Sequence, residues 1–274
     1  MKKALVLVLT TLMCAMTVSA WAQAPAQPAP QIPSLNNNDN ARQARKLLEQ
    51  CITALGGQAW LDVKDMSQEG RTYSYNNGSP TGFGTVFWRF WKYPDKERVE
   101  LTKKRDVVYI HNGDKGYEVT YKGTSLEEPR STKDFLRRRE HSLEVVLRKW
   151  FNDPKTALFY DGPAVAEQKP ADSVTLLSAK NDAVTLFLDR TTHLPIKSQF
   201  EFRAPDRIKD TESEVYDAWR PEQDVMTPHS VLRQKNGEIV NQRFIASVKY
   251  NTGLPETMFE AKVTYAPMRP ATPE

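Results

Sequence analysis

The stretch from Gly82 to Tyr121 constrains the fold more than any other part of the chain. It contains four short runs rich in aromatic and β-branched residues, which are typical of strands, and the first reads GFGTVFWRFW. Four strands in about forty residues leave no room for crossover helices, which need a dozen or more residues each. Neighbouring strands must therefore pair antiparallel, and the Asn-Gly-Asp sequence at residues 112–114 predicts a hairpin between two of them.

The start of the chain has the pattern of a secretory signal peptide. Residues 1–22 combine two lysines, a short apolar run, and small residues at Ala20 and Ala22, after which we expect cleavage. The apolar run is shorter than the roughly 20 residues that a membrane-spanning helix needs, so an uncleaved anchor is disfavoured. Leu-Met precedes Cys14 where a lipoprotein signal would have small residues, so a lipid-anchored form is the lesser alternative.

The remaining chain divides into a linker, one domain and a tail. Residues 23–38 are rich in Pro, Ala, Gln and Asn and indicate a flexible linker, and residues 265–274 form a Pro-rich tail. Between them, residues 39–264 are expected to be a single domain. After cleavage Cys51 is the only cysteine, so no internal disulfide can form, and we interpret it as a small apolar residue on a helix.

Two helices and two groups of strands are predicted. Residues 39–55 carry apolar side chains at spacings of three and four and end at Gly56, while Ser131 begins a second helix that runs to about Asn152. About five strands precede the second helix and about six follow it. This grouping predicts an α+β fold, mainly antiparallel β with helices, in which one large curled sheet of about ten or eleven strands has its helices on one side.

The sequence offers no positive evidence for catalysis. The four histidines, at positions 111, 141, 193 and 229, lack metal-ligand spacing, and no hydrolase, phosphate-loop or dinucleotide motif is present. We therefore predict no catalytic residue, no metal and no cofactor. The formal charge of +4, which falls to about +2 after cleavage, is too small to indicate nucleic acid as a partner. The basic runs at 103–105 and 137–139 are interpreted as solvated faces, with attraction to anionic lipid or an acidic partner as the alternative.

A series of short motifs, in a fixed order, resembles the superfamily of periplasmic lipoprotein carriers and outer-membrane lipoprotein-sorting proteins. The motifs are Gly84, Trp88, Lys92, Pro94 and Arg98, then Asn112-Gly113 with Tyr117 before a helix, then Leu186, Leu188-Asp189 and Leu194-Pro195, and finally Tyr250-Asn251 and Phe259. The resemblance spans roughly residues 41–263. It implies an open, unclosed β-barrel, lidded by helices, around a hydrophobic cavity that takes acyl chains.

Alternation along the strands predicts which side chains would line such a cavity. The alternative is a closed core made of the same residues. Phe87 and Trp91 lie on the other face of their strand, so this strand could be covered on both faces. The predicted lining residues are Val86, Trp88, Phe90, Leu101, Ile110, Tyr117, Val119, Tyr121, Leu186 and Leu188.

These expectations combine into two functional hypotheses. The first is a monomeric periplasmic protein that binds lipid, or the acyl chains of lipoproteins, and acts as a carrier in lipoprotein sorting to the outer membrane. Burial of about 0.8 kcal/mol per methylene would supply the affinity. The second is a periplasmic sensor or scaffold module with a closed core and no transport role, which contacts a membrane-protein partner.

Overall fold

The computed structural model describes residues 36–203 and 209–266. The expected signal peptide, most of the linker and most of the tail lie outside these ranges. The elements of the first half are α1 (Asp39–Leu55), α2 (Gln58–Leu61), β1 (Asp65–Asn76), β2 (Ser79–Pro80), β3 (Thr85–Lys92), β4 (Lys96–Leu101), β5 (Val107–Asn112), β6 (Lys115–Thr120), β7 (Gly123–Leu126) and α3 (Pro129–Glu140). Those of the second half are α4 (Leu143–Val145), the π-helix η1 (Val146–Trp150), β8 (Ala157–Ala166), β9 (Lys169–Leu177), β10 (Ala183–Asp189), β11 (Pro195–Arg203), β12 (Lys209–Glu222), β13 (Val225–Lys235), β14 (Glu238–Tyr250) and the 3₁₀-helix η2 (Glu256–Phe259).

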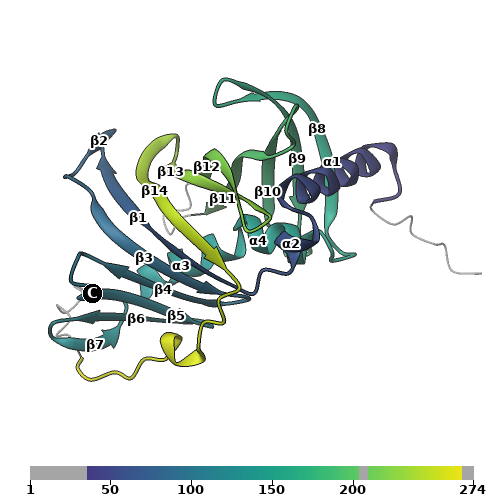
Figure 1. Cartoon of the computed structure of the whole chain (residues 1–274). Helices are drawn as coiled ribbons and strands as arrows, with labels where there is room; N and C mark the ends of the chain where they lie inside the picture. Colours follow the sequence, from purple (N-terminus) through teal and green to yellow (C-terminus); the bar gives the residue numbers. More distant parts are fainter. Residues whose placement is uncertain (1–35, 204–208, 267–274) are drawn as a thin grey trace, which may run out of the picture. The chain divides into compact units, whose positions relative to one another are not determined.

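All fourteen strands belong to one antiparallel sheet in the order β7-β6-β5-β4-β3-β1-β14-β13-β12-β11-β10-β9-β8, with β2 paired to β1. Figure 1 shows the resulting curled sheet, in which the first long strand lies beside the last, and Met66 is paired with Tyr250. The two edge strands, β7 and β8, are not paired with each other, so the barrel is unclosed. This confirms the predicted fold class.

The sheet has more strands than the predicted ten or eleven. The sequence analysis left out β2 and β7, which are only two and four residues long. It also left out β8, where Gly162 and Pro163 interrupt the strand pattern and the register shifts between Tyr160 and Gly162. The segment before Glu214 proves to be the start of β12, because Lys209 already pairs with Arg203.

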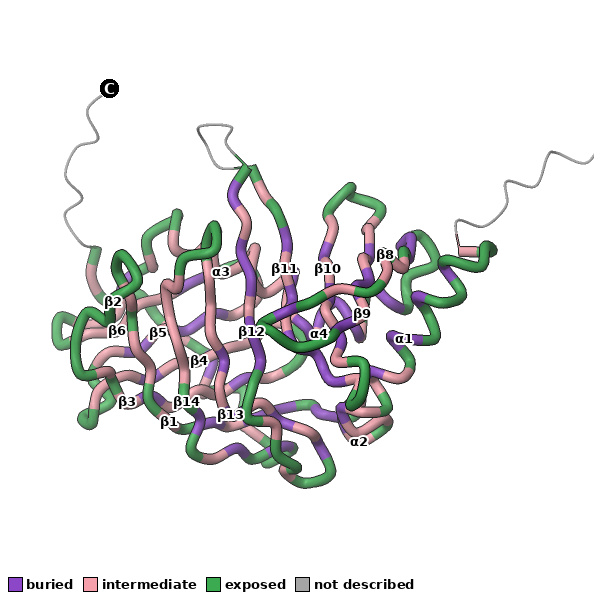
Figure 2. The backbone as a smooth tube through the Cα atoms, turned by 90° about the horizontal axis from the view of Figure 1, so that it is seen from above, coloured by how far each residue is buried: buried purple, intermediate pink, exposed green. Residues whose placement is uncertain are grey.

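Helix α1 spans the predicted residues, and Asn38 caps it, since Asn38 Oδ1 accepts a hydrogen bond from the Ala41 amide at 2.8 Å. Gly56 follows the helix with φ 125°. A Cβ at this position would lie 2.4 Å from the Asp224 carbonyl oxygen, so the position requires glycine. Six residues of α1 are buried, among them Cys51, and burial raises the pKa of the Cys51 thiol. Figure 2 shows buried positions concentrated where α1 meets β8–β10, so this end of the sheet has a filled core.

The prediction of one second helix is wrong, because the segment divides at His141 and Ser142 into α3 and a continuous piece formed by α4 and η1. Chain direction changes at His141, whose ring stacks on Phe200 at 4.2 Å between centroids, and Ser142 caps the new helix by accepting from the Val145 amide. Helix α4 and η1 bury Leu143, Val146, Leu147 and Trp150, whereas no residue of α3 is buried. Helix α3 is therefore held by something other than an apolar stripe.

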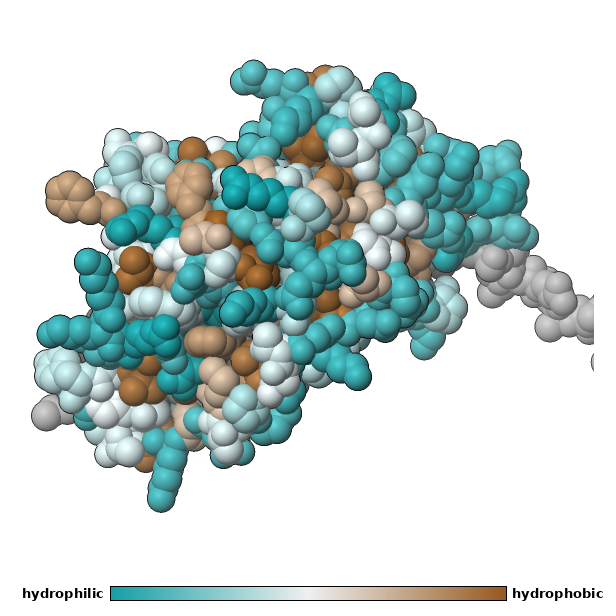
Figure 3. Space-filling model, in the orientation of Figure 1, coloured by the Kyte–Doolittle hydropathy of each residue, from teal (hydrophilic) through white to brown (hydrophobic). Residues whose placement is uncertain are grey.

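Residues 251–266 cover the sheet face that is opposite to α3. Figure 1 shows this segment in yellow, passing from the end of β14 to β7. Asn112 Nδ2 donates to the Phe259 carbonyl at 3.3 Å, the Thr264 amide donates to the Thr124 carbonyl at 2.8 Å, and the Phe259 side chain is fully buried. The face drawn in Figure 3 carries separate hydrophobic patches among hydrophilic side chains, without one large apolar area.

Candidate binding cavity

A cavity of about 250 Å³ lies between the sheet and the two helices α3 and α4. Its floor comes from β1, β3, β4 and β12–β14, and its roof includes Phe135, Ser142 and Leu143. The wall is mixed in character. Its larger apolar side chains are Trp60, Met66, Trp91, Phe135, Leu143, Met226, Val231, Ile245 and Tyr250, and its charged side chains are Arg89, Lys96, Glu97, Arg138, Arg139, Glu144, Glu214, Arg233 and Arg243.

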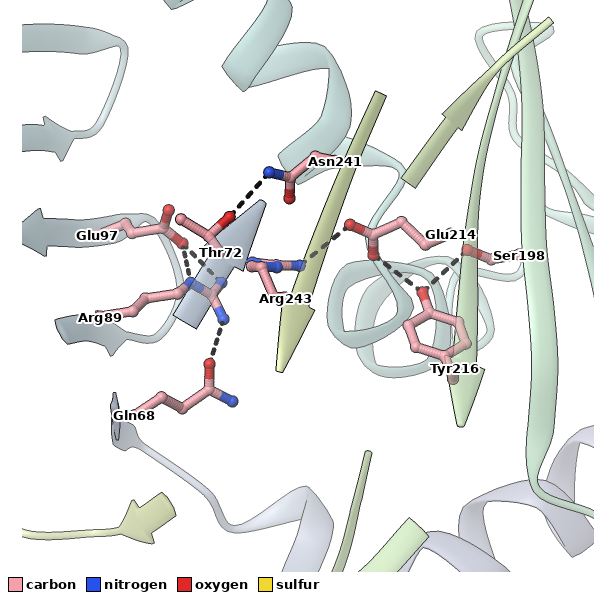
Figure 4. A network of polar contacts seen from close by, with 9 residues as sticks. All are labelled: Gln68, Thr72, Arg89, Glu97, Ser198, Glu214, Tyr216, Asn241 and Arg243. Carbon is pink, nitrogen blue, oxygen red and sulfur yellow. Dashed lines mark hydrogen bonds and ion pairs between the residues drawn. The ribbon is translucent and has the colours of Figure 1, made fainter. Parts of the chain in front are cut away.

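An ion pair on adjacent strands lies in the floor. Arg89 of β3 donates to Glu97 Oε2 of β4 from both Nε, at 2.9 Å, and Nη2, at 2.6 Å, and its Nη1 reaches Gln68 Oε1 (Figure 4). Strand alternation places Arg89 here, because it shares a face with the buried Phe87 and Trp91. Burial raises the pKa of Glu97, but the charge and hydrogen bonds of Arg89 outweigh it and hold that pKa below its ordinary value.

A second polar group lies across the floor on β11, β12 and β14. Arg243 Nη2 donates to Glu214 Oε1 at 3.3 Å, the Tyr216 hydroxyl donates to Glu214 Oε2 at 3.2 Å, and Ser198 and Tyr216 share a hydrogen bond of 2.9 Å (Figure 4). Burial, followed by the charge of Glu214, raises the pKa of Tyr216 well above its ordinary value. Tyr216 is therefore a neutral donor, and the floor presents fixed polar groups.

Helix α3 is attached to the sheet by charged and aromatic side chains. Arg137 Nη2 donates to Glu212 Oε1 of β12 at 2.6 Å, and its guanidinium lies 3.5 Å from the centre of the Phe202 ring. Arg139 Nη1 donates to the carbonyls of Asp95 and Gly113, which lie in the β3–β4 and β5–β6 turns. These contacts fix α3 across the sheet from β12 to the turns at the other side.

The predicted lining residues fall into four places, none of them in the wall of this cavity. Register pairs Phe90 with Arg98, Arg98 with Ile110, and Ile110 with Tyr117, so these positions share one sheet face. That face is the one that residues 251–266 cover, and it also carries Val86, Trp88 and Val119. Of the others, Leu101 packs against the main core from the helix-covered face, Tyr121 is exposed, and Leu186 and Leu188 are buried in the core.

Two of these residues do border a depression. Val86 and Trp88, with Phe244, line an open groove of about 400 Å³ around the bulge at Glu69 and Gly70. Trp88 donates from Nε1 to Glu69 Oε2 at 3.2 Å, so its polar edge is already bonded. Ligand binding by the ten predicted residues stays a prediction, and the geometry favours the enclosed cavity over the groove.

The charged residues of the wall are not among the predicted lining residues, because strand alternation was used to predict an apolar lining. One signal was available: Arg89 interrupts the aromatic run Phe87-Trp88-Arg89-Phe90-Trp91, and a charge within such a strand needs a partner. Neither Arg138 nor Arg233 interrupts an aromatic run in this way. Arg138 lies in the basic run at 137–139, and Arg233 lies in β13. Their place in the wall follows only from how the sheet curls.

The described parts of the chain lack two other kinds of feature. Within residues 36–203 and 209–266, no three His, Cys, Asp or Glu side chains come together as a metal site. In the same ranges, no helix combines the length and apolar character needed to cross a membrane.

Comparison with known proteins identifies the fold. No protein-family model matches the sequence, and no curated protein matches it. A DUF1329 family protein from Desulfovibrio piger superposes with a TM-score of 0.56 at 10% identity, covering 79% of this chain and 97% of that one. An outer membrane lipoprotein-sorting protein domain from Vibrio parahaemolyticus superposes with a TM-score of 0.51 at 11% identity, covering 80% and 97%. The chain has the same fold as these two proteins. At these identities the likeness extends to the fold alone.

Proposed function

We propose that this chain is an exported periplasmic protein that binds a lipid, or the acyl chain of a lipoprotein, in the cavity under α3. It would act as a carrier in lipoprotein sorting and not as an enzyme. The observation that carries the proposal is the cavity itself, enclosed between the sheet and α3, with aromatic and aliphatic side chains such as Trp91, Met226 and Ile245 in its wall. The lipoprotein-sorting domain from Vibrio parahaemolyticus, which has this fold, supports the proposal.

The size of the cavity predicts that α3 moves. Ligand pockets for small molecules span about 300–1,000 Å³, so the 250 Å³ present here would hold only part of a long acyl chain. Helix α3 has no buried residue, whereas α1 has six, so lifting α3 would expose little apolar surface. Displacement of α3 would therefore enlarge the cavity with little loss of apolar burial, at the cost of the contacts that Arg137 and Arg139 make with the sheet.

A neutral apolar probe tests the proposal. The purified mature chain should increase the fluorescence of N-phenylnaphthylamine, and organic extraction followed by mass spectrometry should recover lipid from the protein. Met226→Trp fills the cavity and should weaken probe binding by about tenfold or more. Met258→Trp is the matched control, because Met258 lies in η2 on the opposite sheet face, and it should bind the probe normally.

Two outcomes would refute the proposal. One is a wild-type protein that neither binds the probe nor carries lipid. The other is a Met226→Trp protein that keeps the wild-type melting temperature and binds the probe as well as the control does.

A further inference from the structure

The cavity wall has more positive than negative charge. It contains six Lys or Arg side chains and three Glu side chains. Four of the basic groups are engaged: Arg89 by Glu97, Arg243 by Glu214, Lys96 by Glu256, and Arg139 by two backbone carbonyls. The two that remain are Arg138 and Arg233.

Arg138 and Arg233 have no hydrogen bond or ion pair with any residue in the ranges 36–203 and 209–266. Arg138 belongs to α3 and Arg233 to β13, so one comes from the roof and one from the floor. Both line the main cavity, and both also line a small adjoining pocket, together with Ser142 and Glu214. Burial, and after it the charge of Arg138, lower the pKa of Arg233 to about 10. The two guanidiniums are therefore close enough for their charges to interact.

No carboxylate among the described residues forms an ion pair with Arg138 or Arg233. Glu144 also lies in the wall without a hydrogen bond to the described residues, and its charge acts on Arg89, Arg148, Tyr216 and Tyr250. The carboxylates whose charge acts on Arg138 or Arg233 are bonded elsewhere: Glu127 to His111 and Thr132, Glu212 to Arg137, and Glu214 to Arg243 and Tyr216.

We propose that Arg138 and Arg233 together bind the anionic headgroup, a phosphate or carboxylate, of an amphiphile whose chain lies along the apolar wall. This inference rests on the proposed lipid-binding function and names the class of lipid. A guanidinium offers several donors in a fixed plane, which suits the oxygens of phosphate and carboxylate. An anion between the two side chains would also join α3 to β13 and so hold α3 closed while the ligand is bound.

Three ligands separate the headgroup from the chain: dodecyl phosphate, dodecanol and inorganic phosphate, each used to displace N-phenylnaphthylamine or measured by calorimetry. Dodecyl phosphate should bind at least about tenfold more tightly than dodecanol. Arg138→Met and Arg233→Met should each remove most of that difference by weakening the binding of dodecyl phosphate, whereas dodecanol should bind at least as tightly as it does to the wild type. Lys104→Met, which removes an exposed charge from the β4–β5 turn, is the control and should keep the full difference. Arg233→Lys should keep part of it, because it retains the charge without the planar fork.

The outcomes distinguish this inference from the proposed function. Equal binding of dodecyl phosphate and dodecanol, or an unchanged preference in both Met variants, would overturn the anionic headgroup and leave the apolar cavity standing. Arginine-dependent binding of inorganic phosphate as tight as that of dodecyl phosphate would show a free-anion site and overturn the amphiphile. Loss of dodecanol binding in the Met variants along with dodecyl phosphate binding, at unchanged melting temperature, would also count against it.

Discussion

The ion pair between Arg137 and Glu212 is predicted to control how often α3 leaves the sheet. The pair is partly shielded, with side-chain exposures of 17% and 8%, and its shortest distance is 2.6 Å. A hydrogen bond to a charged group contributes about 1.5–3 kcal/mol, and the stacking of Arg137 on Phe202 adds about 0.5–1 kcal/mol. Arg137→Met should therefore destabilise the closed position of α3 by about 2–4 kcal/mol, which raises the open population by about 30- to 900-fold.

Hydrogen exchange measures this population directly, because amides that exchange through local opening report its free energy. The protection of the α3 amides, residues 129–140, should fall by about 30- to 900-fold, while that of the α1 core should change little. Glu212→Gln should have a similar effect, and the double variant should cost less than the sum of the two. Lys133→Met, at an exposed position of the same helix, is the matched control. Unchanged exchange in α3, or an equal loss of protection in α1, would refute the reasoning.

Two further predictions concern the segment that covers the other face. Asp65 accepts hydrogen bonds from the backbone amides of residues 252–254 and from the Thr252 hydroxyl. Asp65→Ala should therefore lower the free energy of unfolding by about 3 kcal/mol, measured by urea unfolding. A change of less than about 1 kcal/mol would contradict this role of Asp65. Hydrogen bonds from Lys92, and next from Lys96, lower the pKa of Glu256 from 4.5 to about 2. The stability that these bonds contribute is therefore fully present above about pH 4.5 and is lost as the pH falls through about 2. Glu256→Gln should flatten this acid dependence of the melting temperature, and an unchanged pH profile would exclude Glu256 as its source.

Much of the fold follows from local signals. Asn236 and Gly237 both have positive φ, 53° and 83°, as the Asn-Gly hairpin signal predicts, and the turn at residues 112–114 likewise joins two paired strands. The apolar spacing of residues 39–55 likewise produced the observed helix. Short edge strands gave too little pattern to detect, and the helix break at Ser142 depends on His141 stacking against a distant strand.

The faces of the strands could not be assigned from alternation alone. In β3 one face carries Phe87 and Trp91 and the other carries Trp88 and Phe90, so both sets are equally apolar. What decides between them is remote in sequence. The segment that contains η2 packs on one face of the sheet beside β4 and β5, and the helices cover the other face. Neither contact leaves a trace in the local pattern. Alternation alone therefore does not show which of the two sets faces the helices, and the set that does so also contains Arg89.

The two kinds of group in the cavity wall place opposite requirements on a ligand. Apolar side chains such as Trp91 and Ile245 gain from contact with hydrocarbon, whereas guanidiniums without protein partners lose their hydration if hydrocarbon covers them. A purely apolar ligand that filled the cavity would desolvate Arg138 and Arg233 without compensation, and a small anion alone would leave the apolar wall in water. Only a ligand with a charged end and an apolar chain satisfies both. The position of Arg138 on α3 adds a consequence, because such a ligand would stabilise the closed helix that retains it.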